Sequence, residues 1–157
     1  MRVCGIDPGS KGAMCVLDSN DSAYLALLDL DKTSIYEATK WLHHQNVDTV
    51  YIEDVHSLFG MSAKSNFNFG KNLGLVTAIA EITSRGVFPT LVTPKIWQKF
   101  VGVTVKGKLI KKQVAEIVSK LYPSANITGK KGGLLDGRSD SLMICYYGLH
   151  HKEVYED

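Results

Sequence analysis

The sequence has few features of a membrane protein, a disulfide scaffold or a zinc protein. Its three cysteines, Cys4, Cys15 and Cys145, lie in apolar runs without CxxC or histidine spacing, so we expect free core thiols in a reducing compartment. No apolar stretch approaches the roughly 18 residues of a membrane span. The N-terminus enters a strand without a signal-peptide pattern. We therefore expect a cytoplasmic protein that binds no membrane.

Internal repeats, linkers and low-complexity segments are also lacking. The chain has 157 residues, of which 45% are hydrophobic and 22% charged. This is the composition of a domain large enough to bury a core. We expect one domain over residues 1–157.

The net charge is only +2, but the basic residues are concentrated in one stretch. Residues 1–93 carry seven basic and ten acidic side chains, whereas residues 94–140 carry ten basic and three acidic ones. Residues 141–157 are again acidic, with one basic side chain against three. This asymmetry favours a partner that carries phosphate groups.

Three short strands open the predicted fold. Apolar runs separated by turn residues predict strands over 2–6, 13–17 and 23–30, joined as an antiparallel meander. A helix capped by Ser34 then crosses to a strand over 49–52. Because strand–helix–strand units are nearly always parallel and right-handed, this strand should lie beside the first.

The rest of the chain is predicted to be mainly helical. In chain order we expect a mobile loop over 56–64, a helix over 65–85 that stops at Gly86, a strand over 87–92, a short helix from 94, a helix over 109–121, an irregular loop over 123–135, a helix that contains 142–147, and a frayed end after 152.

Acidic residues follow two of the predicted strands. Asp7 begins the turn that continues through Pro8, and Glu53 ends the strand over 49–52. Alone, the first is most often a turn former and the second an exposed strand end. Asp136 and Asp140 flank the start of the last helix. Because carboxylates that converge from separate elements suit Mg²⁺, we predict that these four acids form a metal site.

Several motifs, in this order and spacing, together resemble the RuvC family of Holliday junction resolvases in a phage-type form. They are Gly5-Ile6-Asp7-Pro8-Gly9-Ser10, Ile52-Glu53, Gly70-Lys71-Asn72-Leu73-Gly74, Phe100-Val101-Gly102 and Ser139-Asp140-Ser141-Leu142. The resemblance covers residues 2–150. It implies an α/β RNase H-like fold: a central five-stranded mixed sheet, with three antiparallel and two parallel strands, flanked by helices.

The resemblance also implies an activity. A resolvase cuts four-way junctions, and in some cases other branched DNA, by paired Mg²⁺-dependent nicks that leave 5′-phosphate ends. Asp7 would bridge two Mg²⁺ ions, for which Mn²⁺ substitutes; Glu53 and Asp140 would each hold one, and Asp136 would complete a site or orient a water. Paired nicks on a two-fold symmetric junction imply a homodimer, with the helix over 65–85 as candidate interface. The implied location is the bacterial cytosol, with a phage gene as one source.

The last acidic pair departs from the family pattern. The bacterial form is Asp-x-x-Asp, whereas residue 137 here is glycine and Asp136 stands four residues before Asp140. A four-residue offset places both side chains on one helical face, provided that the helix already exists at Asp136. Otherwise Asp136 is a loop acid.

Basic and aromatic side chains near the proposed site are candidates for DNA contact. A lysine cluster is usually a solvated helix face, but this one adjoins two of the acids, which favours phosphate contact. Phe59 is either a core residue or a platform on which an unpaired base stacks. The full set of candidates is Phe59, Lys106, Lys108, Lys111, Lys112 and Arg138.

Two other classes of function remain open. A module that binds branched DNA without cutting it would have the same basic stretch. The Gly-Ile-Asp-Pro-Gly start also resembles the first phosphate motif of actin-like ATPases and sugar kinases, but those proteins clasp a nucleotide between two such domains. Since the Gly9–Gly12 turn lacks the Walker spacing and leads into a strand, we expect no nucleotide cofactor.

Overall fold

A mixed five-stranded sheet forms the centre of the computed structural model, which describes residues 1–55, 61–84 and 87–154. The strand order is β3-β2-β1-β4-β5. The strands are β1 (Arg2–Asp7), β2 (Ala13–Asp18), β3 (Asp21–Asp29), β4 (Thr49–Glu53) and β5 (Thr90–Val92). The first three strands are antiparallel, and β4 and β5 continue the sheet in parallel from β1. The predicted mixed sheet is therefore confirmed.

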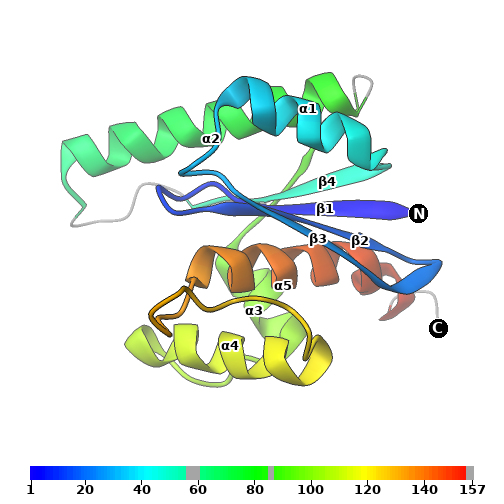
Figure 1. The fold of residues 1–157 in the computed structure, drawn as a ribbon. Helices are drawn as coiled ribbons and strands as arrows, with labels where there is room; N and C mark the ends of the chain where they lie inside the picture. The colour runs from blue at the N-terminus through cyan, green and yellow to red at the C-terminus, as the bar shows by residue number, and fades with distance from the viewer. Residues whose placement is uncertain (56–60, 85–86, 155–157) are drawn as a thin grey trace.

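Helices cover both faces of this sheet (Figure 1). On one face lie α1 (Ile35–Gln45) and α2 (Ala63–Thr83), which pack on a core that includes Ile6, Ile52 and Leu42. On the other face α5 (Asp136–His150) lies against the sheet, with α3 (Pro94–Val101) and α4 (Ile110–Leu121) outside it. Short 3₁₀ helices, Gly107–Leu109 and His151–Val154, precede α4 and follow α5.

Local sequence signals set most of the boundaries. The Ser34 hydroxyl accepts a hydrogen bond from the Glu37 N–H, as a helix N-cap does. The prediction for α2 was two residues late, because Ser62 caps it in the same way. The strand over 87–92 was too long, since β5 begins at Thr90. The end after 152 continues as a 3₁₀ helix to Val154. Residues 56–60 of the expected loop, including Phe59, and Gly86 lie outside the described residues.

The contact between α5 and β1 is unusually close. A Cβ atom at Gly5 would lie 2.3 Å from the Cys145 nitrogen and 2.5 Å from the Ser141 oxygen, so only glycine allows this approach. The Cys145 thiol donates a hydrogen bond to the Val3 carbonyl at 3.0 Å. The three cysteines are free and buried, as predicted. Among the described residues, no helix is both long and apolar enough to cross a bilayer.

Gly5→Ala should destabilise the protein, because the added methyl group meets the backbone of α5. We expect a loss of about 1–3 kcal/mol in the free energy of unfolding, typical of an overpacked core, measured by urea denaturation. Gly70→Ala is the matched control, since nothing lies within 4 Å of its added Cβ. In the middle of α2 it should gain about 0.5–1 kcal/mol. Equal stability of the two variants would contradict the close packing.

Candidate active site

Four acids lie at one edge of the sheet. Asp7 is the last residue of β1 and Glu53 the last of β4, and the two preceding residues, Ile6 and Ile52, are paired in the parallel ladder. The prediction that Asp7 and Glu53 are neighbours is thus confirmed. Asp136 is the first residue of α5, and Asp140 follows one turn later. Because the helix exists at Asp136, the condition for placing both acids on one helical face is met.

Most of these carboxylates are turned toward protein donors. Asp7 accepts a hydrogen bond from the Gly9 N–H at 2.9 Å, and Glu53 accepts one from the Trp97 indole N–H at 2.6 Å. Within the part of the chain that the structure describes, no three His, Cys, Asp or Glu side chains lie close enough to surround one ion. In this structure the four carboxylates are therefore not arranged around one point.

Burial and mutual repulsion disfavour the charged forms of three of the acids. Burial, together with the charge of Asp7, raises the pKa of Glu53 to about 7; this carboxylate is only 8% exposed. Burial likewise raises the pKa of Asp140 well above its usual range, reinforced by the charges of Asp7, Glu53 and Asp136. For Asp7, burial raises the pKa and the Gly9 N–H opposes it. A cation bound among these carboxylates would therefore lower the cost of ionising them.

Trp97 is a site residue that sequence reasoning missed. It is fully buried in α3, and its ring nitrogen fixes the orientation of Glu53. A buried tryptophan almost always finds an acceptor for its N–H, so the residue type indicated a partner without identifying it. The hydrogen bond joins residues 44 positions apart in the chain.

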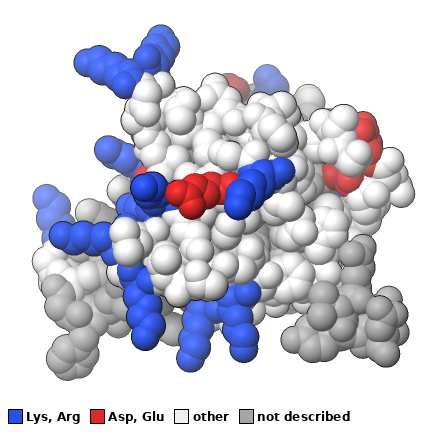
Figure 2. Space-filling model, turned by 90° about the horizontal axis from the view of Figure 1, so that it is seen from below, with Lys and Arg blue, Asp and Glu red and all other residues white. Residues whose placement is uncertain are grey.

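Lys111 lies at the border of the acid cluster. Its ammonium group is 2.6 Å from the Asp136 carboxylate, which raises the lysine pKa. Lys108 and Lys112 line an open groove of about 800 Å³ between α4 and the segment 127–134. Lys106 is exposed just before α4. Figure 2 views this side of the molecule, where basic side chains spread widely around small acidic patches.

Arg138 does not project freely toward solvent. Its guanidinium group donates to both oxygens of Asp29 and to the Asn126 carbonyl. These bonds use three of its five N–H groups, and its role as a DNA contact stays a prediction. The Phe59 prediction concerns a residue outside those that the structure describes.

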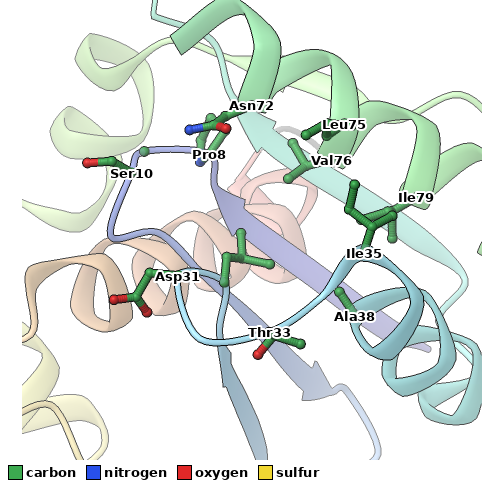
Figure 3. Close-up of a pocket in the computed structure, with 12 residues that line it drawn as sticks. Pro8, Ser10, Asp31, Thr33, Ile35, Ala38, Asn72, Leu75, Val76 and Ile79 are labelled. Atoms are coloured by element: carbon green, nitrogen blue, oxygen red, sulfur yellow. The ribbon is translucent and has the colours of Figure 1, made fainter. Parts of the chain in front are cut away.

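A cavity of about 200 Å³ lies behind the turn that follows Asp7 (Figure 3). Pro8 and Ser10 form one wall, and Val76 and Ile79 of α2 contribute apolar surface. None of the four acids lines it. The cavity therefore adjoins the acid cluster through a shared turn but is a separate space.

The raised pKa of Glu53 predicts a pH-dependent stability of the metal-free protein. The folded state retains a proton up to about pH 7, whereas the unfolded chain releases it near 4.5. Stability therefore falls as the pH rises through this window. Glu53→Gln should remove this loss while keeping an acceptor for Trp97. We expect it to stabilise the protein by about 3 kcal/mol at pH 8, and by much less at pH 5.

Denaturation in EDTA at a series of pH values measures this difference. Glu116→Gln is the control, because this side chain on α4 is exposed and lies outside the acid cluster. It should leave the pH dependence of stability unchanged. A Glu53→Gln curve parallel to that of the wild type would show that Glu53 ionises normally.

The sequence matches no protein-family model and no curated protein. Solved structures that share its fold include the following three. Thermus thermophilus RuvC with a Holliday junction substrate has a TM-score of 0.63 at 16% identity, covering 98% of this chain and 96% of that one. A second Thermus thermophilus RuvC structure has a TM-score of 0.62 at 20% identity, covering 98% and 97%. The fowlpox virus Holliday junction resolvase has a TM-score of 0.59 at 17% identity, covering 99% of each chain. This chain therefore has the RNase H-like fold, in the form that these resolvases share.

Proposed function

We propose that this chain is a metal-dependent endonuclease that resolves four-way DNA junctions by paired nicks. The observation that carries the proposal is the gathering of Asp7, Glu53, Asp136 and Asp140 at one edge of a resolvase-like fold. A protein that only binds DNA gains nothing from buried acids that repel one another and the phosphate. Acids held together in this way are typical of functional sites.

The donor set fits Mg²⁺ or Mn²⁺. All four side chains offer carboxylate oxygens, the hard ligands that these ions prefer. Burial, and after it the charges of the neighbouring acids, raises the pKa values of Asp7, Glu53 and Asp140, and a divalent cation would relieve the repulsion between them. When bound, such ions supply an activated water and stabilise the leaving 3′ oxygen.

The chain's own side chains have distinct tasks in this proposal. Trp97 orients Glu53 through its indole N–H. Lys111 balances Asp136 in the absence of DNA and lies where a backbone phosphate would enter. Lys108, in the 3₁₀ helix before α4, and Lys112, on α4, extend the positive surface, which suits a duplex arm because phosphate contacts dominate the affinity of such proteins.

A homodimer is part of the proposal, with α2 as its interface. The first half of this helix buries no residue, since its buried side chains are Val76, Ile79 and Ala80. Phe67 is 71% exposed and Ile82 70% exposed. Helical spacing places both on one face, with the exposed Ala78 and Lys71 between them. A face with this much exposed apolar surface suits a second copy better than solvent.

Asp7→Asn, Glu53→Gln and Asp140→Asn should each abolish the cutting of a synthetic four-way junction in Mg²⁺. The amides keep the shape of the side chains but lose the charge that holds a cation, so we expect rates to fall by several orders of magnitude. Junction binding in Ca²⁺ should persist, because removing negative charge reduces repulsion of the phosphates. Single-turnover cleavage and gel-shift assays measure the two quantities.

Asp136→Asn tests whether the fourth acid takes part. A variant that binds but does not cut would make it a fourth ligand, whereas normal cutting would leave three.

Other outcomes decide between the candidate functions. Wild-type cleavage undiminished in EDTA would contradict the metal mechanism. Junction binding without any cutting would favour the non-catalytic binding module, and ATP hydrolysis without cutting would favour the kinase-like alternative.

Lys108→Ala and Lys112→Ala should weaken junction binding independently of sequence. Each variant should lower the slope of log affinity against log salt by about 0.9, the value for one phosphate contact on duplex DNA. Lys40→Ala on α1, on the opposite face of the sheet, is the matched control and should leave the slope unchanged. Unchanged slopes in all three variants would make the α4 lysines a solvated face.

A further inference from the structure

An ion pair joins the end of β3 to the first turn of α5. The Arg138 Nε and Nη2 atoms each lie 2.7 Å from one oxygen of Asp29, and Nη1 donates to the Asn126 carbonyl at 2.9 Å. Both side chains are only about one-fifth exposed, at 22% and 21%. Such a bidentate, partly buried ion pair fixes the relative orientation of its two side chains. It joins residues 109 positions apart in the chain.

The first turn of α5 has no side-chain N-cap, so it is held by other contacts, among them the ion pair of Asp136 with Lys111. Leu135 occupies the N-cap position and provides no side-chain hydrogen bond, so the usual side-chain cap is missing, although the Leu135 N–H donates to the Ile127 carbonyl at 2.7 Å. Asp136 is the first helical residue, and Arg138 stands two residues later. The Asp29–Arg138 ion pair, called the clamp below, therefore acts directly on the turn that carries Asp136.

The same place is in contact with the turn that follows Asp7. A Cβ atom at Gly137 would lie 2.0 Å from the Lys11 carbonyl oxygen, so the helix start abuts that turn. The Leu30 N–H, next to Asp29, donates to the Gly12 carbonyl at 2.9 Å. Asp29, Asp136 and Arg138 also line one small cavity of about 140 Å³. The ion pair thus ties the start of α5 to the end of β3, which is in turn hydrogen-bonded to the turn that follows Asp7.

Asp140 has a different support. It lies one turn further along α5, close to the part of the helix that packs against Gly5 of β1. Loss of the clamp would leave that packing intact. Its effect should therefore concentrate on Asp136.

We propose that Arg138 and Asp29 form a positioning pair that holds Asp136 in place for the cation. The inference rests on the proposed function and assigns Arg138 a role inside the protein instead of a contact with DNA. Residues that orient a metal ligand typically contribute 10–100-fold to metal affinity. Asp29, which no motif singled out, becomes a determinant of the site.

The test compares Asp29→Asn and Arg138→Gln with the wild type. Each should weaken Mn²⁺ binding by about 10–100-fold, measured as free Mn²⁺ by electron paramagnetic resonance. Adding Asp29→Asn to Asp136→Asn should cost little further affinity, because the clamp acts through Asp136. Arg138→Lys keeps the charge but loses the fork geometry, so it should recover only part of the affinity.

A second measurement needs no metal. The Arg138 and Ser139 N–H groups donate to the Leu135 carbonyl at 3.0 and 3.3 Å, and their hydrogen exchange in EDTA should accelerate in both clamp variants. Asp18→Asn, which breaks the Arg2–Asp18 pair of 3.1 Å at the other end of β1, is the matched control. It should leave Mn²⁺ affinity and exchange at Arg138 and Ser139 unchanged.

Four outcomes would overturn the inference. Wild-type Mn²⁺ affinity in Asp29→Asn is one, and unchanged exchange at Arg138 and Ser139 in both clamp variants is another. Loss of junction binding in Arg138→Gln, but not in Asp29→Asn, would make Arg138 a DNA contact. A wild-type protein that binds no Mn²⁺ refutes the proposed function and with it the role toward the cation, even where the exchange data establish the clamp.

Discussion

The close approach of α5 to β1 is the constraint on which the rest of the structure depends. A helix can lie this near a strand only because Gly5 has no side chain and because the helix meets it with its own backbone at Ser141 and Cys145. The Cys145 thiol bonded to the Val3 carbonyl adds a polar contact inside an otherwise apolar layer. This approach fixes the axis of α5 relative to β1. It thereby determines that acids near the start of the helix reach the strand end that carries Asp7.

The acid cluster is held against its own electrostatics. Burial of Glu53 and Asp140 makes their ionisation costly, and each ionised carboxylate at this edge adds to that cost for its neighbours. The compensating groups are few: a backbone N–H at Asp7, the Trp97 indole at Glu53 and the Lys111 ammonium at Asp136. Packing elsewhere in the fold must therefore offset the instability of the site. Proteins commonly have lower folding stability where their function requires charged groups to be held close together.

Much of the fold was predictable because its signals are local. Alternating apolar residues, turn residues and the Ser34 cap predicted the meander and the crossover, and the handedness rule then placed Glu53 beside Asp7. The missing parts are contacts between distant segments. Nothing in the residues around Asp29 indicates that its carboxylate meets Arg138, and nothing near Trp97 identifies Glu53 as its acceptor. Both depend on how the helices dock, which is decided by packing across the whole core. The strand over 87–92 was predicted longer than β5 because β5 is the edge strand of the sheet, and apolar residues there need not continue the strand.

The unusual spacing of the last two acids has a steric explanation. The pattern of the bacterial family places an acid three residues before the last one, which here is position 137. At that position a Cβ would lie 2.0 Å from the Lys11 carbonyl oxygen, so no side chain fits and glycine is required. Position 136 is one residue earlier, already helical, and shares a face with Asp140 through the four-residue repeat. Its side chain meets Lys111 at 2.6 Å, which shows that it extends toward α4 and the basic groove. The shift by one residue thus accommodates the close contact between α5 and the turn after β1, and it keeps two carboxylates on the helix face that borders Asp7 and Glu53.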